Sequence, residues 1–369
     1  MNLFKAHRQW ASRPDDERFP TLKALYDATR EYADQASEKV MPFNTLRTEA
    51  IDGDVQLVGT RNLPAKLTHW SFGQLAARVK APADYIRNLP ATLAVQNLNY
   101  GLAHANDEDK ARNAYLLFHT NGDLLCRAIT SDKYARIWNY EVAERLLALQ
   151  SIGWEPATPD TNFAPTAGRF LDPSEMKSTA LYASDHDLFA FLRNENLGIR
   201  TRPNGETTGR RGVIVENSEV GESSLRLTRF IYDYMCGNHI IWGASQVIEL
   251  AIRHIGDAKE RMAIWAAELK RYSNESASEE ESRITKARST VIAATKEEVL
   301  DKVFGMRNIG LGRKVLDASY DAVKPEEDGD PNTVWGLVQG VTRHSQTIPY
   351  ADKRTDLDRA AGKLLEVAF

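Results

Sequence analysis

Residues 115–129 read Tyr-Leu-Leu-Phe-His-Thr-Asn-Gly-Asp-Leu-Leu-Cys-Arg-Ala-Ile, and this stretch gives the clearest fold signal in the chain. Two apolar-rich runs flank the pair Asn121-Gly122, and both residue types tolerate the positive φ of a tight hairpin turn. The stretch therefore predicts a β-hairpin. After it, residues 140–151 place Val142 and Leu146 at helical spacing, so the predicted unit is strand, strand, helix.

Residues downstream of this unit predict a second block of strands and then a run of helices. A proline-rich connector between Pro156 and Pro173 separates the two blocks of strands. The second block is expected to contain strands at 176–184, 187–194, 212–217, 223–234 and 238–243. Helices are expected at 244–272, 283–304, 311–323 and 332–344. Two acidic segments between these helices, 273–282 and 324–330, are interpreted as solvated connectors.

Together these elements predict an α+β fold, with a β-hairpin-rich antiparallel sheet core, a helical N-terminal segment and a helical C-terminal region. A helix is expected near residues 22–32, with Thr21 as its N-cap. We therefore divide the chain into a helical N-terminal appendage (1–60), an α+β core of hairpins and helices (61–243) and a helical C-terminal region (244–369).

The composition describes a folded protein without a strong overall charge. The chain has 369 residues, of which 42% are hydrophobic, and 47 Lys+Arg against 51 Asp+Glu give a formal net charge of −4. This balance excludes a polycation that holds nucleic acid by bulk charge but leaves room for a local basic surface. No apolar run approaches the ~20 residues that span a bilayer, and the first ten residues do not resemble a secretion signal. A cytoplasmic protein without membrane contact is expected.

Signatures of the common enzyme classes are missing from the sequence. It contains no phosphate-binding Gly-x-x-x-x-Gly-Lys-Ser/Thr, no His-Glu-x-x-His and no Gly-x-Ser-x-Gly. In the run Asp185-His186-Asp187 the histidine would face the opposite side of a strand from the two aspartates, so these residues do not predict a metal site. We expect no metal, no cofactor and no catalytic residue, and we favour a protein that is not an enzyme.

A basic loop is the first positive sign of function. Between residues 199 and 212, four arginines and one acid, Glu206, give a local charge of 4 − 1 = +3. The four arginines are Arg200, Arg202, Arg210 and Arg211. Guanidinium groups pair with phosphate in a bidentate manner and can stack on bases. The loop therefore predicts a hairpin tip that contacts phosphates.

The strand expected at 223–234 adds a face that combines a cation with rings. Alternation places Arg226, Phe230 and Tyr232 on one side of this strand. A second group of the same kind follows the first hairpin and consists of Lys133, Arg136 and Trp138. Sheet faces of this composition hold single strands, because bases stack on the rings while cations meet the backbone. The alternative is that the rings pack under helices and the arginines neutralise Glu216, Glu219 and Glu222.

Several ordered motifs carry a resemblance to one prokaryotic family. They include Arg127-Ala-Ile-Thr-Ser-Asp-Lys-Tyr134, Gly212-Val-Ile-Val-Glu-Asn-Ser218, Gly221-Glu-Ser-Ser-Leu-Arg226, Tyr234-Met-Cys-Gly-Asn-His-Ile-Ile-Trp-Gly243 and Asn332-Thr-Val-Trp-Gly-Leu-Val-Gln-Gly-Val-Thr342. Over about residues 60–365 the chain resembles the family catalogued as domain of unknown function 932, also called phage/plasmid-like proteins. The resemblance implies an intracellular role in the biology of mobile elements and no particular substrate.

A looser, architectural similarity links the chain to single-strand annealing proteins of phage recombination. That similarity implies self-assembly into rings or filaments that hold DNA, although fold alone does not fix function. The chain differs from those proteins in its net negative charge and its large helical C-terminal half. The leading hypothesis is therefore a non-catalytic DNA-binding protein, for single-stranded DNA in the first place, that forms homo-oligomers and acts in phage or plasmid recombination, replication or defence.

Three other functions remain open at this point. An enzyme that processes nucleic acid or nucleotides would place its site across Arg127, Asp132, Lys133, Asp185 and His186. A helix-turn-helix regulator of a mobile element would read duplex DNA with residues 74–89. A self-assembling protein that binds protein partners would use Trp335 and the last helices.

Overall fold

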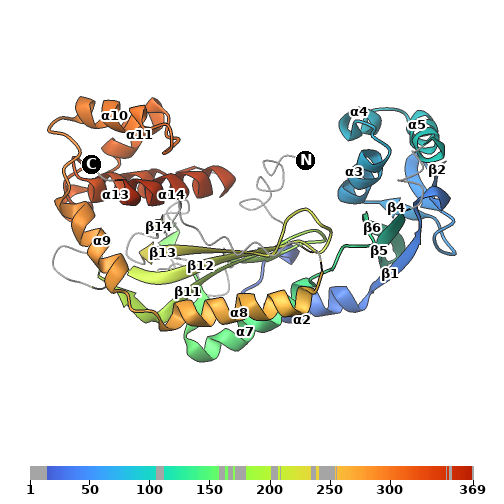
Figure 1. The fold of residues 1–369 in the computed structure, drawn as a ribbon, viewed down its shortest axis with the longest axis horizontal. Helices are drawn as coiled ribbons and strands as arrows, with labels where there is room; N and C mark the ends of the chain where they lie inside the picture. Colours follow the sequence, from blue (N-terminus) through green and yellow to red (C-terminus); the bar gives the residue numbers. More distant parts are fainter. Residues whose placement is uncertain are drawn as a thin grey trace.

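The computed structural model describes residues 15–104, 112–157, 163–164, 169–170, 180–200, 207, 209–233, 238–240, 254, 256–345, 347–348 and 351–367. Its fold is α+β, as predicted, with two large sheets and helices around them. We distinguish an N-terminal lobe (residues 36–131), a central sheet and a C-terminal lobe of helices. Figure 1 shows the central sheet between the two lobes, with the N-terminal lobe on the right and the C-terminal lobe on the left.

The N-terminal lobe is built on a six-stranded sheet. Its strands are β1 (Ala36–Pro42), β2 (Arg47–Ile51), β3 (Asp54–Val58), β4 (Ala65–Leu67), β5 (Asn113–Asn121) and β6 (Asp123–Ser131). They lie in the order β1-β5-β6-β4-β3-β2, and only the β4–β6 pair is parallel among these neighbours. The hairpin predicted from Asn121-Gly122 is present as β5–β6. Gly122 makes its turn with a φ of 76°, a value that glycine adopts without strain.

Three helices cover one face of this sheet: α3 (His69–Arg78), α4 (Ala83–Arg87) and α5 (Ala91–Ala103). Thr68 begins α3 as its N-cap, because its hydroxyl accepts a hydrogen bond from the Ser71 amide at 3.3 Å. Leu75 of α3 and Leu98 of α5 are fully buried against apolar residues of the strands, among them Leu116. These contacts give the lobe a hydrophobic core of its own.

The central sheet is antiparallel and follows the order β10-β11-β12-β13-β14, with β7 also paired to β11. Its strands are β7 (Trp154–Pro156), β10 (Leu181–Ala183), β11 (Leu188–Ile199), β12 (Gly209–Asn217), β13 (Arg226–Asp233) and β14 (Asn238–Ile240). A separate short hairpin pairs β8 (Phe163–Ala164) with β9 (Arg169–Phe170). The second block of strands therefore lies where the alternation predicted it.

One face of the central sheet is covered by α2 (Leu22–Asp34), α7 (Asn139–Ala148) and α8 (Ala258–Asn274), which lie below the sheet in Figure 1. Leu22 of α2, Leu146 of α7 and Trp265 of α8 are fully buried there with Leu227 of β13. Each helix presents an apolar stripe to the sheet, which is the arrangement expected of amphipathic helices.

The C-terminal lobe consists of helices only, within the residues that the structure describes. They are α9 (Ser278–Ser289), α10 (Lys296–Gly305), α11 (Arg313–Asp321), α12 (Pro325–Asp328), α13 (Val334–Ser345) and α14 (Ala351–Glu366). Helix α13 is buried on nearly all sides, and its Trp335, Leu337 and Val341 form the centre of the lobe. Ile199 and Ile231 of the central sheet join this core, so the lobe is packed directly onto the sheet.

Two expectations about organisation are corrected. Residues 36–58 form β1, β2 and β3 of the N-terminal sheet, so this part of the chain is not a helical appendage. The acidic segments 273–282 and 324–330 are not simply solvated connectors, because Glu280 and Asp328 are buried and paired with Arg211 and Arg343. Among the described residues, the structure contains no helix long and apolar enough to cross a membrane.

Candidate functional site

The basic loop lies at the end of the hairpin formed by β11 and β12, and its arginines have different environments. The side chain of Arg200 is 66% exposed, and its Nε lies 3.4 Å from Glu281 of α9. Arg210 donates hydrogen bonds to the carbonyls of Thr207 and Gly209 and lies 3.8 Å from Glu195. Arg202 lies outside the described residues. Among the three loop arginines that the structure describes, Arg200 is thus the most exposed to solvent.

Arg211 is buried inside the protein and cannot contact a phosphate from the surface, contrary to the prediction. Its Nε donates to Glu280 at 2.9 Å, and its other nitrogens donate to the carbonyls of Tyr272, Glu275 and Ser276 at 2.8, 2.5 and 2.7 Å. These carbonyls lie in and just after the last turn of α8, where the final carbonyls of a helix lack partners within the helix. Arg211 therefore fastens the connection between α8 and α9 to the central sheet.

Arg226 and Phe230 share one face of the central sheet, as the alternation predicts, and this face lies on the other side from α2, α7 and α8, but it is not open. Phe230 is fully buried, and its ring lies over Gly212, which is its partner across the β12–β13 ladder. Arg226 lies 3.3 Å from Glu216 on the neighbouring strand. Phe230 is therefore not a stacking surface in this fold. The Tyr232 side chain lies outside the described part of the structure.

The group that follows the first hairpin is also largely internal. Arg136 is buried, donates to Glu38 at 2.7 Å and lies between the rings of Tyr115, Tyr134 and Trp138, with ring centroids 5.2–5.5 Å from its guanidinium carbon. The Trp138 ring is half-buried and already contacts this cation. Lys133 alone of the three predicted residues has an exposed side chain. A cation–π cluster of this kind stabilises the fold.

The predicted pair of helices joined by a short turn is present as α3 and α4, but its geometry does not suit a DNA-recognition helix. Helix α4 has only five residues. Gln74 of α3 donates to the Val220 carbonyl at 2.6 Å and accepts from the Ile129 amide at 2.7 Å. This side chain thus connects the N-terminal lobe to the loop after β12, and it is not available to a DNA base.

The structure brings together three residues of the proposed enzyme site at the junction between the N-terminal lobe and the central sheet. Arg127 of β6 is buried, and it pairs with Glu219 at 2.8 Å and donates to the Asp185 carbonyl at 3.0 Å. Its guanidinium also lies 4.5 Å from the ring centroid of Tyr32 in α2. The Asp185 carboxylate and His186 Nδ1 are hydrogen-bonded at 2.5 Å. The junction therefore joins four sequence-distant segments through polar contacts.

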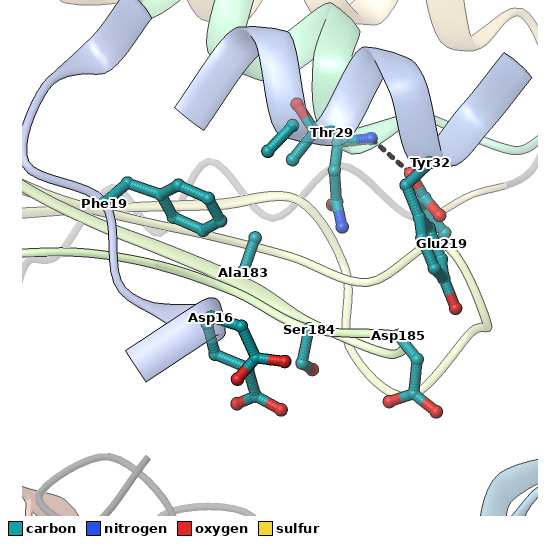
Figure 2. Close-up of a pocket in the computed structure, with 11 residues that line it drawn as sticks. Asp16, Phe19, Thr29, Tyr32, Ala183, Ser184, Asp185 and Glu219 are labelled. Carbon is teal, nitrogen blue, oxygen red and sulfur yellow. Dashed lines mark hydrogen bonds between the residues drawn. The ribbon is translucent and has the colours of Figure 1, made fainter. Parts of the chain in front are cut away.

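A cavity of about 300 Å³ lies beside this junction. Figure 2 shows Tyr32, Glu219 and Asp185 at one end of it and Phe19 at the other. Asp16, Glu17, Asp185 and Glu219 contribute four carboxylates to its lining, and none of its lining residues is a cation. Such a lining disfavours phosphate groups. Among the described residues, moreover, no group of three or more side chains is arranged to hold a metal ion.

The junction also shifts the pKa values of its titratable groups. Burial raises the pKa of the Tyr32 hydroxyl to about 12, although Arg127 opposes this shift. For His186, burial alone would lower the pKa, but the hydrogen bond with Asp185 and the charges of Asp187 and Asp185 outweigh it and leave the pKa raised. His186 also lies against Trp70 of α3, with ring centroids 5.4 Å apart. This histidine therefore contacts both the carboxylate of Asp185 and a ring of the N-terminal lobe.

Three residues at these two places were not singled out from the sequence as pairing partners: Tyr32, Glu280 and Glu281. Glu219 was named only as one of three acids that could neutralise the loop arginines, whereas its partner is Arg127, 92 positions earlier in the chain. Glu280 and Glu281 lie in the acidic segment interpreted as solvated. Nothing local in the sequence indicates which distant arginine each carboxylate meets.

Comparison with known proteins gives one match. Residues 172–361 match a family model described as Domain of unknown function (DUF932). No curated protein and no solved structure matches the chain. The matched segment contains β10–β14 and most of the C-terminal helices, so it includes both Arg200 and Glu281 but not the N-terminal lobe.

Proposed function

The chain belongs to the DUF932 family, and on that premise we propose that it binds single-stranded DNA in the cytoplasm, without acting on it chemically, through the end of the β11–β12 hairpin. The family description names no function, so the proposal is argued from this chain's own residues. Self-association, which the similarity to annealing proteins implies, is part of the same proposal and is tested by light scattering of the free protein.

The observation that supports the proposal most directly is the exposure of Arg200. Its guanidinium stands in solvent at the end of β11, next to the loop that contains Arg202. The neighbouring Glu281 is 3.4 Å away, and such an exposed pair contributes only about 0–1 kcal/mol, so a phosphate can replace it. Because Arg211 is internal, we expect at most three loop arginines to meet DNA: Arg200, Arg202 and Arg210.

A single strand is favoured over a duplex because α3 and α4, the helix pair that the sequence offered for a major groove, do not suit that role. Helix α4 is too short to lie along one, and Gln74 is held by two backbone groups. With Phe230 buried, affinity is expected to come from phosphate contacts and to be independent of base sequence.

The test is binding to labelled oligothymidylate and to a duplex at about 50 mM and about 200 mM salt. Each neutralised phosphate contributes about −0.7 to the slope of log affinity against log salt, so three arginines give a slope of roughly −2. Arg200→Ala with Arg202→Ala should weaken binding, whereas Arg145→Ala, an exposed arginine on α7, should not. Absence of binding by the unmodified protein at low salt would refute the proposal.

A second candidate, chemistry on nucleic acid or nucleotides, is favoured by one observation only. Arg127, Asp185 and His186 meet at one junction beside a cavity. The acidic lining argues against a phosphate-bearing substrate in that cavity. Turnover of a nucleotide or oligonucleotide that disappears in Asp185→Asn would establish this candidate in place of the first.

A further inference from the structure

Three consecutive glutamates begin helix α9 at the end of the β11–β12 hairpin. Successive helical residues point about 100° apart, so three neighbours cannot face one partner. In the structure each of them pairs with a different arginine. The pairs are Glu279 with Arg283 at 2.5 Å, Glu280 with Arg211 at 2.8 Å, and Glu281 with Arg200 at 3.4 Å.

These pairs differ in how firmly they are held. Arg211 and Glu280 are both buried, so their pair belongs to the core of the fold. Glu279 pairs within its own helix, four residues from Arg283. Glu281 is the glutamate that reaches the exposed arginine of the hairpin.

The contact between Glu281 and Arg200 has the chemistry of a phosphate contact. One carboxylate oxygen of Glu281 lies 3.4 Å from the Arg200 guanidinium and also accepts a hydrogen bond from the Arg200 backbone amide at 3.2 Å. Anionic oxygens of DNA are bound by these same two donor types, guanidinium and backbone N–H. Because the Arg200 side chain is 66% exposed and that of Glu281 27% exposed, solvent and ligands can reach the pair.

We propose that Glu281 is a built-in competitor for phosphate, which occupies Arg200 in the free protein and must leave it when a nucleic-acid strand binds. This inference rests on the proposed function and adds an autoinhibitory contact to the same site. The matched charge change two positions before Glu281, in Glu279, provides the control, because Glu279 is 71% exposed and pairs with Arg283 of its own helix.

The experiment measures the affinity of the full chain for labelled oligothymidylate, by fluorescence anisotropy at low salt. Glu281→Gln should tighten binding by about 1.4- to 5-fold, which corresponds to the ~0.2–1 kcal/mol of an exposed ion pair. Glu279→Gln should change the affinity less than Glu281→Gln does. In an Arg200→Ala background, Glu281→Gln should have the same small effect as Glu279→Gln, because the residue for which it competes is gone.

The outcomes separate this inference from the function on which it rests. If the unmodified chain and Glu281→Gln both fail to bind at low salt, the proposed function fails. If the unmodified chain binds but Glu281→Gln and Glu279→Gln have equal effects, the competitor role of Glu281 is refuted and DNA binding stands. If Glu281→Gln still tightens binding more than Glu279→Gln does in the Arg200→Ala background, the effect does not act through Arg200 and the inference is likewise refuted.

Discussion

Replacement of Arg211 provides the sharpest test of how the central sheet is joined to the C-terminal helices. The guanidinium is 1% exposed, pairs with Glu280 and donates to three carbonyls at the end of α8. In Arg211→Met the side-chain volume is largely kept, but Glu280 stays buried without its counter-charge. Breaking a buried pair from one side costs about 3–5 kcal/mol, so we expect the free energy of unfolding to fall by that amount.

The assay is urea unfolding, followed by circular dichroism, of the unmodified chain, Arg211→Met, Glu280→Gln and the double variant. Because the double variant removes both charges, its loss should be smaller than the sum of the two single losses by about 0.5–3 kcal/mol. Arg145→Ala, on the exposed surface of α7, should stay within about 0.5 kcal/mol of the unmodified chain.

Two results would contradict this reasoning. A loss below about 1 kcal/mol for Arg211→Met would mean that the guanidinium is not part of the core, since surface substitutions lie in that range. Strict additivity in the double variant would mean that Arg211 and Glu280 do not act as a pair.

Three further substitutions test packing and protonation. Gly212→Ala should lower the free energy of unfolding by about 1–3 kcal/mol, because a Cβ there would lie 2.3 Å from the Phe230 ring. In the same urea assay, adding Phe230→Leu to Gly212→Ala should recover part of this loss. Equal losses in the single variant Gly212→Ala and in the double variant would contradict the contact. The raised pKa of His186 gives stability that is present below its ordinary pKa of 6.5 and is lost as pH rises through the folded-state pKa. The deficit in Tm of His186→Gln should therefore be largest in acid and shrink as pH rises above 6.5, whereas a constant deficit would exclude a role for protonation. Burial, followed by the charge of Arg136, lowers the pKa of His254 to about 4, so the unmodified chain should lose stability as pH falls from 6.5 toward 4. His254→Gln should lose less stability over this range. Parallel curves of Tm against pH for the two proteins would refute the assignment of this loss to His254.

Local patterns in the sequence predicted the strands because strand formation here depends on neighbours in the chain. The turn residues Asn121-Gly122 predicted the β5–β6 hairpin, and alternation in β13 placed Arg226 and Phe230 on one face of the strand. The same alternation could not tell whether this face is open. A strand in the middle of a sheet can be buried on both faces, and period-two patterning describes the two faces without saying what covers either.

The candidate site was harder to predict than the fold because its charges are set by long-range pairing. Arg200 and Arg211 are eleven positions apart in a segment that sequence arithmetic treats as one basic loop, yet one is exposed and the other is 1% exposed. The two arginines differ in exposure for two reasons. The strand register of β12 turns Arg211 toward α8, and α9, which begins about 70 residues later in the chain, packs there and provides Glu280 as its partner. No local count of charges contains that information.

The effective charge of the hairpin end therefore depends on helix α9 as much as on the hairpin itself. Four arginines and Glu206 give +3 from residues 199–212 alone, but Glu280 cancels Arg211 inside the protein and Glu281 lies against Arg200 outside it. Counting these two carboxylates leaves 3 − 2 = +1, which is too little to attract nucleic acid over a distance in salt. An anionic strand would bind this surface by replacing Glu281 at Arg200. The affinity then depends on the positive charge of Arg200 that becomes available when Glu281 leaves. This is why the comparison of Glu281→Gln with Glu279→Gln is more informative than any measurement of overall charge.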